Sequence, residues 1–134
     1  MADHEGVDDD ARCPCLTGLP YGECCGPLHR RERAAPTAEA LMRSRYSAFA
    51  VGDAAYLLSS WHPSTRPADL EIDPDQRWLR LDVVSATGGG PFDDAGTVEF
   101  VATYRQDGQR GQLREVSRFV REGGRWFYVD GDVA

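Results

Sequence analysis

The sequence contains no lysine and no asparagine among its 134 residues, so all 15 basic residues are arginines. The missing lysine excludes a Schiff-base nucleophile and the lysine of a phosphate-binding loop. The net charge of −7 at pH 7 argues against DNA binding, which requires a basic face. The length and the 41% hydrophobic content predict one globular domain with a small appendage.

Long apolar runs are also missing, so the sequence predicts no membrane-spanning segment. The first ten residues carry five acids and no arginine, and they lack the apolar stretch of a secretory signal. We therefore expect a cytoplasmic protein whose residues 1–11 form a disordered acidic tail.

Four cysteines fall within 13 residues: Cys13, Cys15, Cys24 and Cys25. The adjacent pair has Cα atoms about 3.8 Å apart, which is shorter than the usual disulfide range. Reduced thiols in the cytoplasm favour metal or redox chemistry, and a structural zinc site uses four protein ligands. Iron also accepts four thiolates, and His29 is close enough in the sequence to be an alternative ligand. A redox-active pair and four unconnected thiols remain the alternatives.

The spacing of these cysteines is C-x-C-x8-C-C, and Thr17-Gly18 follows the second cysteine. This pattern resembles the SEC-C motif, a short zinc-binding element of the bacterial secretion ATPase SecA and of several small bacterial proteins. The resemblance implies a zinc knuckle over residues 12–29 with a structural Zn²⁺ held by Cys13, Cys15, Cys24 and Cys25. Neighbouring arginines could compensate the charge of the thiolates. They are Arg12, Arg30, Arg31 and Arg33.

Residues 37–132 are predicted to form an α+β domain. Thr37 is expected to cap a helix that ends at Gly52, and Asp53 a second short helix through Leu58. Turn signals then separate four runs typical of strands. These runs are 78–87, 97–106, 111–122 and 125–130.

The turns suggest a register for the predicted antiparallel sheet. A four-residue loop would pair Gln106 with Gly111, and a two-residue turn would pair Glu122 with Arg125. One face of the sheet then becomes aromatic and should cover the helices. In this register the same face also carries Glu115, Ser117 and Asp130.

The stretches LMRSRYSAF (41–49), YLLSSWHPSTRP (56–67), EVSRF (115–119) and RWFYVDG (125–131) resemble the bacterial YchJ-like family. That family joins an N-terminal SEC-C motif to a nuclear transport factor 2-like domain. The resemblance implies a cone, in which a curved antiparallel sheet wraps around helices and often encloses a pocket. Fold alone does not define a function, because such cones include enzymes, binding proteins and scaffolds.

His62 is the histidine available to the main domain, and it could act as a general base with Glu115 or Asp130. Alternatively, His62 holds its connection through a backbone hydrogen bond. Carboxylates on an aromatic face must line a wet pocket or form salt bridges, for example with Arg43 or Arg45. The candidate pocket residues are Tyr46, Trp61, His62, Glu115, Ser117 and Asp130. We find no nucleophile elbow and no Gly-rich phosphate loop, so an enzyme is the less favoured interpretation.

Three functions are open at this stage. The SEC-C resemblance favours a docking module for another protein, such as a chaperone, secretion or ribosome-associated protein, through Arg30, Arg31 and Arg33. The alternative is a small-molecule binding protein or enzyme that uses the cone pocket. RNA contact through the arginines of residues 26–45 is the third possibility.

Overall fold

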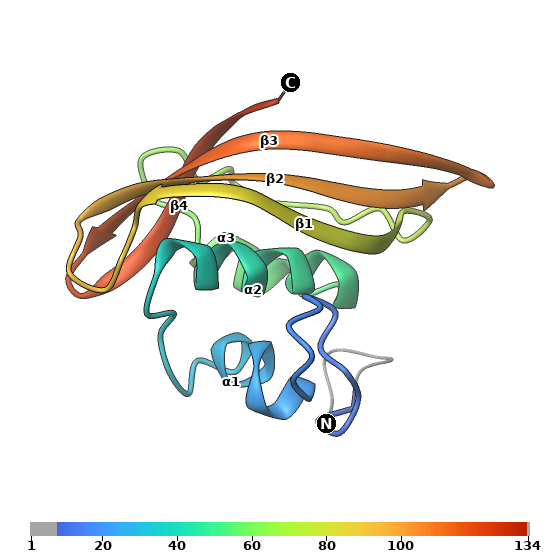
Figure 1. The fold of residues 1–134 in the computed structure, drawn as a ribbon, viewed down its shortest axis with the longest axis horizontal. Helices are drawn as coiled ribbons and strands as arrows, with labels where there is room; N and C mark the ends of the chain where they lie inside the picture. Colours follow the sequence, from blue (N-terminus) through green and yellow to red (C-terminus); the bar gives the residue numbers. More distant parts are fainter. Residues whose placement is uncertain (1–7, 134) are drawn as a thin grey trace.

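The computed structural model describes residues 8–133, in which helices occupy the first half of the chain and strands the second (Figure 1). The N-terminal part holds a short 3-10 helix, η1 (Tyr21–Glu23), and a short helix, α1 (Cys25–His29). Helices α2 (Ala38–Val51) and α3 (Ala54–Ser59) follow. The strands are β1 (Arg77–Gly88), β2 (Ala95–Gln106), β3 (Gln109–Glu122) and β4 (Arg125–Val133). The predicted α+β class is confirmed.

The ends of α2 and α3 are those that the sequence predicts. The Thr37 hydroxyl accepts a hydrogen bond from the Ala40 amide at 3.1 Å, and Gly52 ends α2 in the left-handed region with a φ of 81°. Asp53 caps α3, because its carboxylate accepts from the Tyr56 amide at 3.0 Å. The two helices are therefore joined by only two residues.

The four strands form one antiparallel sheet in the order β1-β2-β3-β4. Glu122 pairs with Arg125 as predicted, across the turn at residues 123–124. The predicted pairing of Gln106 with Gly111 is wrong, because Gln106 pairs with Gln109. Asp107 and Gly108 both have positive φ values and close the hairpin in two residues. The error is two residues, so each β2 and β3 side chain keeps its predicted face.

Strand β4 contains an irregularity that the sequence analysis did not predict. Tyr128 pairs with Phe119, but Asp130 pairs with Arg118, so one extra residue lies on β4 between these pairs. The extra residue moves Asp130 to the outer face of the sheet, where its carboxylate accepts from Arg118 Nε at 2.5 Å. The predicted position of Asp130 on the aromatic face is therefore wrong.

Helix α2 lies between the curved sheet and the N-terminal segment (Figure 1). The larger core fills the space between the helices and the sheet, with residues such as Leu57, Val98 and Phe119 almost fully buried. A second, much smaller core consists of three cysteines and Tyr21, with Cys24 packed against it. We call residues 12–29 the knuckle, with the bounds predicted from the sequence. Within residues 8–133, no helix combines the length and apolar character needed to cross a membrane.

Candidate functional site

Tight turns bring the first cysteine pair toward the second. The Cys13 amide donates to the Leu19 carbonyl at 3.0 Å, and the Leu16 amide donates to the Cys13 carbonyl at 3.0 Å. Leu16 and Gly18 both have positive φ values, which reverse the chain within a few residues. Helices η1 and α1 then present Cys24 and Cys25 to the first pair.

The four cysteines form one compact cluster. All four Sγ atoms lie within 4.8 Å of one another. Cys15 Sγ lies 3.4 Å from Cys24 Sγ, which in turn lies 3.9 Å from Cys25 Sγ. Thiolates on a tetrahedral zinc ion with Zn–S distances near 2.3 Å are about 3.8 Å apart. The sulfur positions therefore fit one tetrahedral metal ion.

The cluster is shielded from solvent on most sides. Cys13 and Cys15 are 0% exposed and Cys25 is 2% exposed, whereas Cys24 is half-buried. Hydrogen bonds from Cys15 and Cys25 lower the pKa of Cys13, while contacts with Cys13 and Cys15, together with burial, raise the pKa of Cys25. Among Cys13, Cys15 and Cys25, the thiols therefore stabilise one thiolate at the expense of the other two, and a bound cation would favour the ionised form of all three.

Helix α2 packs against the cluster on the side that faces the sheet (Figure 1). Ser47 Oγ lies 3.7 Å from Cys13 Sγ, and Arg43 donates to the Cys15 carbonyl at 3.2 Å. Arg43 also lines a hollow beside Cys24, together with Arg33. These cations lie where they can offset the negative charge of thiolates, a role that the sequence analysis gave to Arg33 but not to Arg43.

His29 lies outside the sulfur cluster. Its Nδ1 atom lies 2.5 Å from the Tyr21 hydroxyl, and its Nε2 atom lies 2.8 Å from the Ser44 carbonyl. Because both ring nitrogens hold protein partners, the structure does not favour His29 as the alternative metal ligand. Instead His29 connects the knuckle to α2, since Ser44 belongs to that helix.

The structure divides the predicted docking arginines into two groups. Arg30 forms ion pairs with Asp9 and Glu32 at 3.0 Å each. The other two, Arg31 and Arg33, line a groove. Exposed arginines from two segments distant in the sequence line the same groove. The four arginines of this groove, which we call the arginine groove, are Arg31, Arg33, Arg66 and Arg125.

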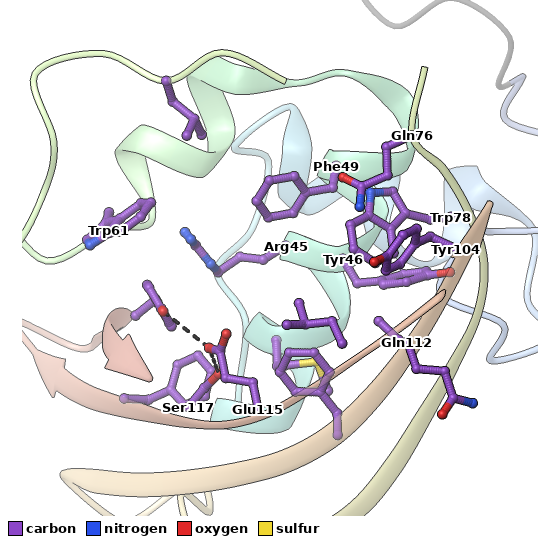
Figure 2. Close-up of a pocket in the computed structure, with 17 residues that line it drawn as sticks. Arg45, Tyr46, Phe49, Trp61, Gln76, Trp78, Tyr104, Gln112, Glu115 and Ser117 are labelled. Carbon is purple, nitrogen blue, oxygen red and sulfur yellow. Dashed lines mark hydrogen bonds between the residues drawn. The ribbon is translucent and has the colours of Figure 1, made fainter. Parts of the chain in front are cut away.

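The interior of the cone contains a cavity of about 360 Å³ between α2 and the sheet (Figure 2). Of the predicted pocket residues, Tyr46, Trp61, Glu115 and Ser117 line this cavity, whereas His62 and Asp130 do not. The bulge in β4 accounts for Asp130, as described above. The rest of the lining is largely aromatic and includes Phe49, Trp78, Phe100, Tyr104 and Phe119.

His62 holds the segment after α3 against β4. Its amide donates to the Tyr128 carbonyl at 2.7 Å, and its Nε2 atom lies 3.0 Å from a carboxylate oxygen of Glu122. The structure therefore shows the backbone hydrogen bond of the alternative interpretation. It does not pair His62 with Glu115 or Asp130, and so does not favour a general base in the cavity.

Arg45 is a buried cavity residue, which the sequence suggested as a salt-bridge partner and as one of the arginines for RNA contact. It is 6% exposed, and its Nη1 donates to the Leu57 carbonyl at 2.8 Å and to Ser60 Oγ at 2.6 Å. The guanidinium carbon lies 5.0 Å from the ring centre of Trp61 and 4.4 Å from that of Tyr128. Among residues 8–133, no carboxylate forms an ion pair with Arg45.

Glu115 lies on β3 and carries the carboxylate of the cavity. One of its oxygens, Oε2, accepts from Ser117 Oγ at 2.6 Å and from the Tyr128 hydroxyl at 3.2 Å. The cavity therefore contains a cation and an anion that are both fixed by neighbouring groups but are not paired with each other.

Comparison with known proteins supports both parts of the molecule. Residues 37–131 match the family of YchJ middle NTF2-like domains. A UPF0225 protein of Corynebacterium glutamicum is 54% identical over 91% of this chain and 97% of its own length. A UPF0225 protein of Streptomyces coelicolor is 52% identical over 90% of this chain and 94% of its own length.

Two solved structures are similar to this chain over most of its length. The solution structure of a SEC-C motif containing protein from Rhodopseudomonas palustris matches with a TM-score of 0.81 and 35% identity, over 92% of this chain and 99% of that one. The crystal structure of a SEC-C motif containing protein from Psychrobacter arcticus matches with a TM-score of 0.74 and 27% identity, over 100% of this chain and 86% of that one.

Proposed function

The chain belongs to the YchJ-like family, and from this premise we propose that its knuckle binds a structural zinc ion and serves to dock another protein. The observation that carries the metal site is the cluster of four sulfur atoms within 4.8 Å of one another. Four thiolate ligands leave no open coordination position, so the metal stabilises the knuckle and does not activate a substrate. A reducing compartment such as the cytoplasm would keep these thiols available for the metal.

The arginine groove supports the docking role. Arg31 and Arg33 follow the knuckle, Arg66 follows α3, and Arg125 begins β4, so the groove lies where the knuckle segment meets the cone. Among the described residues, none of these four arginines forms an ion pair. Leu28, Trp126 and Phe127 add apolar surface to the same groove. Exposed arginines beside aromatic residues are typical of protein interfaces, and here they suit an acidic protein surface.

The docking proposal is tested by comparing the proteins that tagged variants retain from a bacterial lysate. We expect Arg66→Glu/Arg125→Glu and Cys24→Ser/Cys25→Ser to lose the same partner. A matched charge reversal at the far hairpin, Arg105→Glu/Arg110→Glu, should retain it, because both of these arginines are exposed and lie outside the groove. Identical partners from all variants, or retention of RNA alone, would contradict the proposal.

A second candidate function is the binding of a small molecule in the cone cavity. It is favoured by the volume of about 360 Å³, which lies at the lower end of the range for ligand sites, and by the charged side chains of Arg45 and Glu115 in a largely aromatic lining. Filling the cavity by Ala102→Leu should abolish such binding without affecting the knuckle, because Ala102 lines the cavity from β2. Ligand binding is then measured by titration of the wild-type and filled proteins.

A further inference from the structure

The cavity has a charged end and an end that is mainly aromatic. Figure 2 shows Arg45, Glu115, Ser117 and Trp61 at one end, and Tyr46, Trp78 and Tyr104 at the other, where Gln76 and Gln112 also lie. This separation predicts an amphipathic occupant whose polar head meets Arg45 and Glu115 while its apolar body lies among the aromatic rings.

Arg45 offers donors that the protein does not use. Its Nη1 is engaged by Leu57 and Ser60, but its Nε and Nη2 make no hydrogen bond to any residue within 8–133. The flanking rings of Trp61 and Tyr128 fix the guanidinium in place. A planar guanidinium with two free donors matches a carboxylate, and a buried cation without a counter-ion is costly. The polar head should therefore carry a carboxylate.

Glu115 places a second requirement on the polar head of the ligand. Its Oε2 is occupied by Ser117 and Tyr128, whereas its Oε1 accepts no hydrogen bond from residues 8–133. Burial lowers the pKa of Arg45 to about 10, and this shift is opposed by Tyr128 and Tyr56 and, to a smaller extent, by Glu115. Among the ion pairs of residues 8–133, none joins Arg45 to Glu115. A head that bridges them needs a hydrogen-bond donor next to its carboxylate.

We propose that the cavity binds a small α-amino or α-hydroxy acid with an apolar, preferably aromatic, side chain. Its carboxylate would lie against Arg45, its α-ammonium or α-hydroxyl group would donate to Glu115 Oε1, and its side chain would lie among Phe49, Trp78 and Phe100. This inference rests on the second candidate function, because it requires that the cavity admits a small molecule. It is independent of the zinc site and of the arginine groove.

Four probes of nearly equal size separate the two parts of the head. They are L-phenylalanine, phenyllactate, 3-phenylpropionate, which lacks the α-donor, and phenethylamine, which lacks the carboxylate. We expect phenylalanine or phenyllactate to bind at least about tenfold more tightly than the other two, because a hydrogen bond to a charged group contributes that much. Which of the first two binds more tightly identifies the donor as ammonium or hydroxyl.

The indole N–H signals of the three tryptophans report the position of binding in NMR titrations of the full chain. Trp61 and Trp78 line the cavity, whereas Trp126 lines the arginine groove, so the first two signals should shift and the third should not. Glu115→Gln keeps the shape of the side chain and should reduce phenylalanine binding to the level of 3-phenylpropionate. Glu99→Gln, on a solvent-facing side chain of β2 paired with Arg114, is the matched control.

The outcomes are distinct. Equal binding of all four probes would overturn the ligand class while leaving the second candidate function in place. Equal binding by the wild type and by Glu115→Gln would also overturn it. If none of the probes shifts Trp61 or Trp78, both the ligand class and small-molecule binding of this kind in the cavity are contradicted.

Discussion

Helix α2 has two faces that are stabilised in different ways. Toward the sheet it packs against the large apolar core, in which side chains such as Leu57 and Phe119 are almost fully buried. Toward the knuckle it meets a small core of cysteines and Tyr21, and Leu28 is the knuckle residue that joins the large core. A set of four thiols buries little apolar surface, so the knuckle must obtain its stability from another source. Together with the proposed metal site, this comparison predicts that the cone folds through hydrophobic burial and that the knuckle is stabilised by a bound metal.

Removal of the proposed metal should produce the largest effect, and it should unfold the knuckle while the cone stays folded. With a strong chelator, or in Cys24→Ser/Cys25→Ser, we expect the amides of residues 12–29 to lose their protection from hydrogen exchange. Binding of a structural zinc by thiolates contributes about 10–16 kcal/mol in small domains. Amides of β2 and β3 should stay protected. Loss of protection across the whole chain would show that the two regions do not differ in this way.

Leu57→Ala should produce the opposite pattern. Leu57 is 0% exposed on α3, and its truncation should lower the free energy of unfolding of the cone by about 2–5 kcal/mol. The metal content per chain should not change, because Leu57 belongs to the larger core alone. Denaturant unfolding of the metal-loaded protein measures the first effect and elemental analysis the second. A loss of metal at equal folded fraction would contradict the separation.

Tyr21→Phe tests the connection between the two regions. The hydroxyl of Tyr21 lies 2.5 Å from His29 Nδ1, and Tyr21→Phe removes this buried hydrogen bond. We expect a cost of about 1 kcal/mol, seen as faster exchange of knuckle amides with the metal still bound. Tyr104→Phe, in the cavity lining, is the control and should leave knuckle exchange unchanged.

Thr37→Ala should have the smallest effect and should act on both regions together. The Thr37 side chain caps α2, and loss of such a cap costs about 1 kcal/mol. Because α2 contacts the knuckle and the sheet, exchange should rise modestly in both. An effect confined to one region, measured by the same exchange experiment, would indicate that the two faces of α2 respond independently.

Local signals explain why much of the fold could be predicted. Thr37, Gly52 and Asp53 act on neighbouring backbone groups, so the helix ends follow from the sequence. Alternating apolar residues likewise placed the β2 and β3 side chains on the correct faces, even though the turn at Asp107-Gly108 was predicted two residues too long. The bulge before Asp130 has no comparable local signal, because it depends on how β4 fits the curved sheet.

The sites were predictable to different degrees for the same reason. The spacing of the four cysteines predicts the metal site, and the structure brings their sulfur atoms together. The arginine groove combines Arg31 with Arg66 and Arg125, which are far apart in the sequence. The sequence places Arg45 near an apolar stripe but does not predict its burial between Trp61 and Tyr128, because that burial depends on tertiary packing.

Elemental analysis of the untagged, purified protein is the most direct test of the central claim. The account predicts one zinc ion per chain, and none in Cys24→Ser/Cys25→Ser, whose cone should remain folded. Chains without metal whose knuckle amides are nevertheless protected from exchange would contradict it, as would iron in place of zinc.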